Sequence, residues 1–190
     1  MEHAVVTITH GAGTTRIKRE VLVHAEFPIL VVRINAQGRD SFSANISLEP
    51  PEFPVGNATQ HASPGENQSA LFGYTVYHGN TSFSVEGIAI ATQGVVVCGK
   101  GSMLRASKCR EVLLILALCP SQKGSDPEAM AAETLARFLD RHEGKKELLW
   151  ERLRNDHTQS WRRLFGNTAL DLGGKAGRDA PTDERIAAYM

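Results

Sequence analysis

The chain has 190 residues, which is long enough for one domain with its own core, or for one domain and an appended segment. It carries 21 basic and 21 acidic residues, and this zero net charge argues against a nucleic-acid or membrane-surface partner held by bulk electrostatics. The longest apolar run, residues 112–119, falls far short of the ~18 residues that cross a bilayer, and no signal peptide is visible.

The first 120 residues have the pattern of an antiparallel β-sheet protein. Alternating or continuous apolar runs are separated by turns that contain Gly or Pro. These runs predict strands over residues 14–26, 29–34, 40–48, 71–77, 82–92, 94–98, 103–106 and 112–119. Short strands with no helices between them indicate an antiparallel β-sandwich. Residues 49–70, with four prolines and much Asn, Gln and Ser, are predicted to be a long surface loop.

Helical patterns begin after Pro120. Asp126, Pro127 and Glu128 predict a helix start, because Asp is a good N-cap, Pro suits the first turn and an acid favours the positive end of the dipole. A second amphipathic helix is predicted over residues 145–165. The sequence therefore predicts a mainly β fold in two parts, an antiparallel β-sandwich over residues 1–120 followed by helices over residues 121–190.

The last ten residues, PTDERIAAYM, read as the beginning of a further helix. Pro181 and Thr182 suit the entry, and Asp183 and Glu184 suit the first turn. Isolated helices shorter than ~12 residues are marginal in water, so we expect the sequence to stop inside an element, as a piece of a longer protein would.

Three cysteines leave at least one thiol unpaired, and their spacing matches no zinc pattern. Buried free thiols are the first interpretation, and a Cys98–Cys109 bridge is the alternative.

The side chains that could do chemistry all have structural explanations. Asp156 fits a solvated helix face, Asp171 an outward position on a short extended piece, and Asp183 and Glu184 a first helical turn. His157 lies on the apolar stripe of the second helix, which is typical of a hydrogen-bonded core or interface histidine.

Trp150 and Trp161 lie on or beside that stripe, so packing is favoured over a sugar-stacking platform. No short helical His pair and no phosphate-binding glycine loop is present. We therefore predict no catalytic residue, no cofactor and no metal ligand in this chain.

Four Asn-X-Ser/Thr sequons stand at Asn45, Asn57, Asn67 and Asn80. They predict N-glycosylation sites if the protein is secreted, and they favour a secreted or extracellular location.

Several stretches resemble glycoside hydrolase family 95, the α-L-fucosidase family with some α-galactosidase members. The more specific stretch is HTQSWRRLFGNTALDLGG at residues 157–174, followed by PTDERIAAYM at residues 181–190; it looks like the family's linker. Residues 14–50, with an Arg-Glu pair before a Val-Val-Arg strand, and residues 81–121 are similar to strands of its N-terminal domain.

The resemblance implies a supersandwich-like N-terminal domain over residues 1–120, incomplete at its start, and an α-helical linker over residues 121–190 that leads to an (α/α)6 barrel. In that family the catalytic acid and base lie in the barrel, so the resemblance assigns no catalytic residue here. It implies that the chain is a non-catalytic fragment whose partners are the barrel of its own parent enzyme and, through that barrel, an oligosaccharide.

Two alternatives remain open at this stage. One is a free-standing carbohydrate-binding or interaction module, for which Tyr74, Tyr77 and Phe83 are the candidate surface aromatics. The other is an unrelated enzyme whose site the pattern does not reveal.

Overall fold

The computed structural model describes most of the chain. The described residues are 4–12, 15–38, 40–51, 57–66, 68–121, 125–144 and 146–165. No helix within these ranges is long and apolar enough to span a membrane.

Strands come first along the chain and helices follow. The strands are β1 (Val6–Ala12), β2 (Thr15–Val23), β3 (Ile29–Ala36), β4 (Phe42–Ile46), β5 (Asn57–Pro64), β6 (Ser69–His78), β7 (Thr81–Ala91), β8 (Val95–Cys98), β9 (Leu104–Cys109) and β10 (Glu111–Pro120). The helices are α1 (Pro127–Arg141), a short 3-10 turn (Lys146–Leu148) and α2 (Leu149–Phe165).

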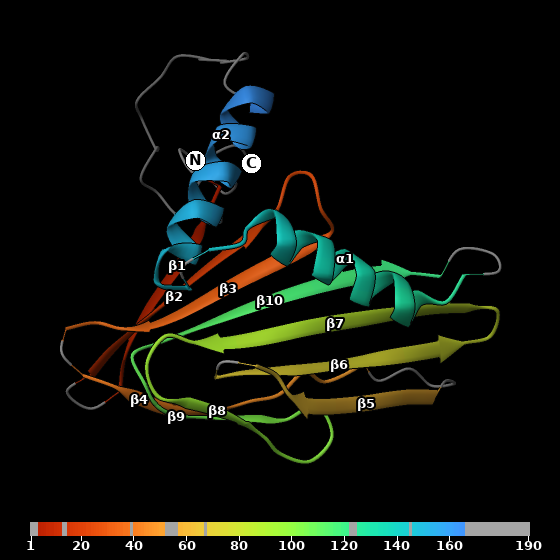
Figure 1. Ribbon diagram of the computed structural model, residues 1–190, viewed down its shortest axis with the longest axis horizontal. Helices are drawn as coiled ribbons and strands as arrows, with labels where there is room; N and C mark the ends of the chain where they lie inside the picture. The colour runs from red at the N-terminus through yellow and green to blue at the C-terminus, as the bar shows by residue number, and fades with distance from the viewer. Residues whose placement is uncertain are drawn as a thin grey trace, which may run out of the picture.

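The strands form two antiparallel sheets that pack face to face (Figure 1). The larger sheet has seven strands in the order β1-β2-β3-β10-β7-β6-β5, and the smaller has three in the order β4-β9-β8. Both helices lie on the face of the larger sheet that points away from the smaller one (Figure 1). The predicted fold class, an antiparallel sandwich followed by helices, is confirmed.

Strand β10 lies at the centre of this three-layer arrangement, and its sequence shows why. Leu113 and Ile115 pack against the helices, whereas Leu114 and Leu116 pack against the smaller sheet. A strand that is buried on both faces needs a continuous apolar run rather than an alternating one. Each fully buried Leu or Ile side chain contributes roughly 1.5–3 kcal/mol of transfer free energy.

Helix α1 begins where the sequence predicts. The Asp126 carboxylate accepts hydrogen bonds from the backbone N–H groups of Glu128 (3.0 Å) and Ala129 (3.4 Å), so it caps two free donors of the first turn. The apolar stripe of α1 is buried against β7 and β10. Helix α2 rises from the sheet beside β2, with Leu149, Trp150 and Leu153 buried at its base (Figure 1).

The prediction of a loop over residues 49–70 was wrong in its second half, where β5 pairs with β6 from Asn57↔Tyr77 to Pro64↔Ala70. Strand β5 has one neighbour and is mostly exposed, so it needs no apolar pattern. Pro64 lies at its last position, where an edge strand tolerates a missing donor. Strand β1, at the opposite edge, was not predicted either, for the same reason.

The three cysteines are free thiols. Cys109 and Cys119 are buried and Cys98 is half-buried, which confirms the first interpretation and rules out the alternative bridge. Burial raises the pKa of the Cys109 thiol, so this side chain behaves as a small apolar residue.

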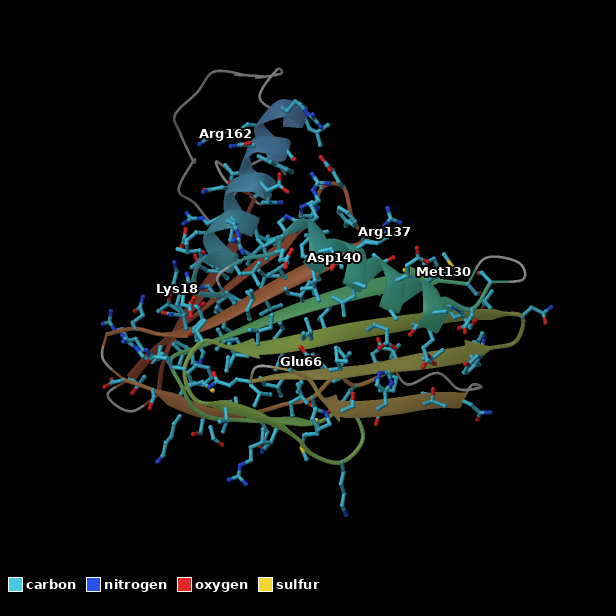
Figure 2. All side chains as sticks on the ribbon, in the orientation of Figure 1. Lys18, Glu66, Met130, Arg137, Asp140 and Arg162 are labelled. Atoms are coloured by element: carbon cyan, nitrogen blue, oxygen red, sulfur yellow. The ribbon has the colours of Figure 1, made fainter. Side chains whose placement is uncertain are left out.

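Charged side chains of both signs cover the outside of the sheets and helices. Glu66, Arg137, Asp140 and Arg162 are exposed examples (Figure 2). This mixture agrees with a chain whose formal net charge is zero.

Candidate functional site

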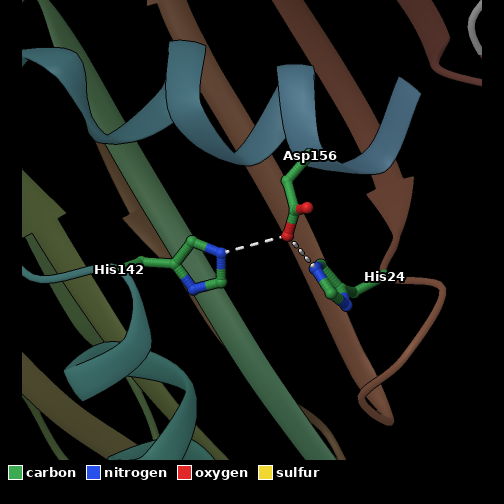
Figure 3. A group of neighbouring side chains, drawn as sticks. All are labelled: His24, His142 and Asp156. Atoms are coloured by element: carbon green, nitrogen blue, oxygen red, sulfur yellow. Dashed lines mark hydrogen bonds and ion pairs between the residues drawn. The ribbon is translucent and has the colours of Figure 1, made fainter. Parts of the chain in front are cut away.

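Three side chains that are far apart in the sequence meet between the sheet and the helices (Figure 3). His24 follows the end of β2, His142 caps the C-terminal end of α1, and Asp156 lies on α2. The Asp156 Oδ2 atom is 3.1 Å from His24 Nε2 and 3.4 Å from His142 Nε2. We call these three residues the His24 cluster.

The hydrogen bonds around His24 fix its tautomer. Its Nδ1 atom accepts from the backbone N–H groups of Glu26 (3.2 Å) and Phe27 (3.3 Å), so Nδ1 carries no hydrogen. Nε2 therefore carries the hydrogen and donates it to Asp156. The ring also makes edge contacts with Phe27 and Phe138, which keep it in place.

His142 has a different surrounding. Its Nδ1 atom is 2.8 Å from the backbone oxygen of Phe138, and its Nε2 atom faces the Asp156 carboxylate. Both ring nitrogens thus face acceptor oxygens, one on the backbone of α1 and one on the α2 carboxylate.

The electrostatics of the cluster follow from this geometry. Burial is the largest influence on His24 and lowers the pKa of its ring, although Asp156 works in the opposite direction. Burial also works to raise the pKa of Asp156, but hydrogen bonds from His24 and His142, with smaller electrostatic contributions from His24 and Arg141, outweigh it and hold that pKa below its usual value. The neutral His24 ring and the ionised carboxylate are therefore the favoured forms.

The geometry of the His24 cluster favours a hydrogen-bonded contact between structural elements over a metal-binding site. A metal ion on His24 Nε2 would need the hydrogen on Nδ1, where it would oppose the two backbone N–H groups. As a hydrogen-bonded group, the cluster joins β2, α1 and α2 through one carboxylate.

The interpretation of Asp156 as a solvated helix residue was wrong. Its carboxylate is two-thirds buried and joins two histidines that lie 132 and 14 residues away. The neighbouring Arg152 and Arg154 suggested a charged exterior face, and no local pattern signals a contact with β2.

His157, in contrast, is the interface histidine that the sequence predicts. It is 4% exposed, and its Nε2 atom is 3.1 Å from the backbone oxygen of Ala4, so the ring joins α2 to the segment before β1. It lines an apolar groove with Trp161 and Leu164.

The aromatic candidates for sugar stacking do not form an exposed platform. Trp150 is buried beneath the Arg33 guanidinium, which lies 5.4 Å from the ring centroid. Tyr74 is buried, and it packs edge-on against the half-buried Phe83. Tyr77 is the one residue of the Tyr74, Tyr77 and Phe83 set that is mostly on the surface, at 46% exposure.

Three of the predicted glycosylation sites lie at exposed positions. Asn45 is on β4, Asn57 begins β5, and Asn80 lies in the turn between β6 and β7. Asn67 lies outside the described residues, as do the carboxylate candidates Asp171, Asp183 and Glu184. Glycosylation itself stays a prediction.

A group of charged side chains lies near the middle of β2 and β3. Arg33 bonds Glu20 (Nη1 to Oε2, 3.1 Å) and Glu111 (Nε to Oε2, 2.6 Å), and Lys18 bonds Glu20 at 2.7 Å. Burial works to raise the pKa of Glu20, but Lys18 and Arg33 outweigh it and lower that pKa. The sequence signals here were the Arg-Glu pair and the Val-Val-Arg strand, which the fold places side by side.

Comparison with protein-family models found no match, and comparison with curated protein sequences found none. The function therefore has to be inferred from the residues and their arrangement.

Proposed function

We propose that this chain is the non-catalytic N-terminal and linker region of an α-L-fucosidase-like glycoside hydrolase of family 95, whose parent type hydrolyses terminal α-L-fucosidic bonds of oligosaccharides. The observation that carries the proposal is the order and packing of the elements. An antiparallel sandwich is followed by helices, and the helix that contains the start of the most specific stretch packs beside β2.

The contacts within the resembling stretches add support. Glu20, from the Arg-Glu pair, and Arg33, from the Val-Val-Arg strand, form an ion pair on adjacent strands. His157, the first residue of the linker-like stretch, is held at the sandwich by Ala4. Residues of these motifs thus have structural roles, as expected of a supporting domain.

We propose that the catalytic residues lie outside this chain. Asp156 is held by two histidines, which lower the pKa of its carboxyl group and leave it unsuited to act as a proton donor near neutral pH. The catalytic acid and base would belong to the parent enzyme's barrel, which is the expected partner and the contact with oligosaccharide. Exposed sequons at Asn45, Asn57 and Asn80 support a secreted parent protein.

The alternative of a carbohydrate-binding module has less support. Such modules bind sugars on exposed aromatic side chains, and Tyr74 and Phe83 pack into the sandwich instead.

The test is hydrolysis of an aryl α-L-fucoside by the purified chain, with binding of fucose and fucosylated oligosaccharides followed by calorimetry in the same samples. We expect neither turnover nor binding. Turnover would overturn the proposal that the chain is non-catalytic. Binding without turnover would favour the carbohydrate-binding module.

A further inference from the structure

A second group of metal-ligating side chains lies beneath the first turn of α1, near the opposite edge of the large sheet from β1. It consists of His61 on β5, Glu86 on β7 and Glu128 in the first turn of α1; we call it the His61 cluster. One imidazole nitrogen and one carboxylate oxygen from each glutamate all lie within 4.8 Å of one another. His61 Nε2 and Glu86 Oε2 are 3.0 Å apart.

The sheet register explains how these side chains meet. Gly73 on β6 pairs with His61 on one side and with Glu86 on the other. A Cβ atom at Gly73 would lie 2.9 Å from both carboxylate oxygens of Glu86. The missing side chain therefore leaves a gap between the two strands, and the imidazole and the carboxylate meet across it.

The two carboxylates of this cluster lie close together. Glu86 is 8% exposed, and one of its oxygens lies within 4.8 Å of an oxygen of Glu128. Within the described parts of the chain, neither glutamate pairs with a lysine or arginine. Two carboxylates beside one imidazole would gain from a divalent cation, which compensates both charges at once.

Hydroxyl groups hold the carboxylates in position. The Ser84 hydroxyl is 3.2 Å from Glu86 Oε1, and the Thr75 hydroxyl is 3.4 Å from Glu128 Oε2. Such outer contacts orient metal ligands in many sites. Glu128 is exposed and the His61 side chain is 40% exposed, so an ion can reach the cluster from solvent.

We propose that His61, Glu86 and Glu128 bind a divalent first-row metal ion of the zinc or manganese class. A mixed imidazole and carboxylate donor set suits these ions, whereas calcium and magnesium prefer oxygen ligands alone. The bound ion would join the edge strand β5 to the central strand β7 and to α1. In contrast with the His24 cluster, no backbone N–H group of the described residues bonds the second ring nitrogen of His61.

The test is calorimetric titration of the metal-stripped 190-residue chain with Zn²⁺ and Mn²⁺, followed by the visible spectrum of the Co²⁺ form. We expect one equivalent of bound metal. His61→Ala removes a ligand at a half-buried position and Glu128→Gln one at an exposed position, and each should weaken binding about 10-fold or more. His10→Ala, on β1 at the far edge of the same sheet, is the matched histidine control and should leave binding unchanged.

Two results would overturn the proposal. One is the absence of binding by any of the three ions. The other is binding that survives His61→Ala but is lost in His142→Ala, because the ion would then occupy the His24 cluster. Retention of the wild-type circular dichroism spectrum by His61→Ala separates loss of a ligand from loss of the fold.

Discussion

Gly73 lies where a side chain would clash with neighbouring atoms. A Cβ atom there would lie 2.5 Å from the backbone oxygen of Val85 and 2.9 Å from the Glu86 carboxylate. We predict that Gly73→Ala lowers the free energy of unfolding by about 1–3 kcal/mol, because the strands must shift to admit the methyl group. Urea unfolding followed by circular dichroism measures this change.

Gly11→Ala is the matched control for this prediction. Gly11 is also on a strand, but nothing lies within 4 Å of the position of an added Cβ atom. The control should change stability by less than about 0.5 kcal/mol. If both variants lose the same free energy of unfolding, the close approach at Gly73 is not the cause of the destabilisation.

His24 makes stability depend on pH. Its folded pKa lies below the ordinary value of 6.5, so the fold favours the neutral ring. The contribution of this residue is therefore present in full above about pH 6.5 and is lost as the pH falls through the lowered folded pKa. Asp156 acts in the same direction at lower pH, because its pKa is also lowered.

We accordingly expect the free energy of unfolding to fall as the pH drops below about 6.5, towards the lowered folded pKa of His24. In His24→Gln this part of the pH dependence should disappear, since glutamine does not titrate. Urea unfolding at several pH values gives the comparison. A variant with an unchanged pH profile would contradict the assignment of a neutral, buried His24.

Single-residue chemistry was only partly predictable from the sequence. The cap at Asp126 and the buried position of His157 follow from local patterns, and both are observed. The role of Asp156 was missed because its partner His24 lies 132 residues away, and only the docking of α2 beside β2 brings them together.

At the scale of elements, α2 is held by a small apolar base. Leu153 is fully buried near Trp150, whereas Leu164 near the C-terminal end of the helix is 61% exposed. We predict that Leu153→Ala costs about 2–5 kcal/mol of unfolding free energy, because it removes buried methyl groups and leaves a cavity. Leu164→Ala should cost less than about 0.5 kcal/mol. Thermal or urea unfolding of both variants, compared at the same pH, tests whether α2 belongs to the cooperative fold.

Central strands were more predictable than edge strands. The run at residues 112–119 corresponds to β10 within one residue at each end, because burial on both faces demands apolar side chains throughout. Strands β1 and β5 have partners on one side only, and their exposed side chains carry no such constraint. Backbone pairing with β2 and β6 places these two strands. Such pairing imposes little requirement on the type of side chain, so the sequence shows few signs of it.

At the scale of the whole molecule, the apolar stripe of α2 has more cover than the sequence suggests. The large sheet buries Trp150 and Leu153, whereas Leu164 remains exposed. Further exposed apolar side chains lie at the end of the sandwich around Val23 and Leu118 and along the edge strand β1.

Strand β1 is an edge suited to pairing with another chain. It has no lysine, arginine, aspartate or glutamate, and Val6 and Ile8 are 58% and 50% exposed. Uncharged β-branched edges expose unpaired backbone groups to neighbouring molecules, and a chain with zero formal net charge has little repulsion to prevent contact. We predict concentration-dependent self-association, measured by sedimentation velocity.

Ile8→Lys should shift the distribution towards the monomer, because a charged side chain on an edge strand opposes pairing. Leu118→Lys is the matched control, since Leu118 is similarly exposed, at 49%, but lies on the central strand β10. If Leu118→Lys alone restores the monomer, the molecules associate through the open end of the sandwich rather than through β1. A wild-type chain that remains monomeric at every concentration would show that neither surface promotes association, and the twist of β1 would then be sufficient to protect its edge.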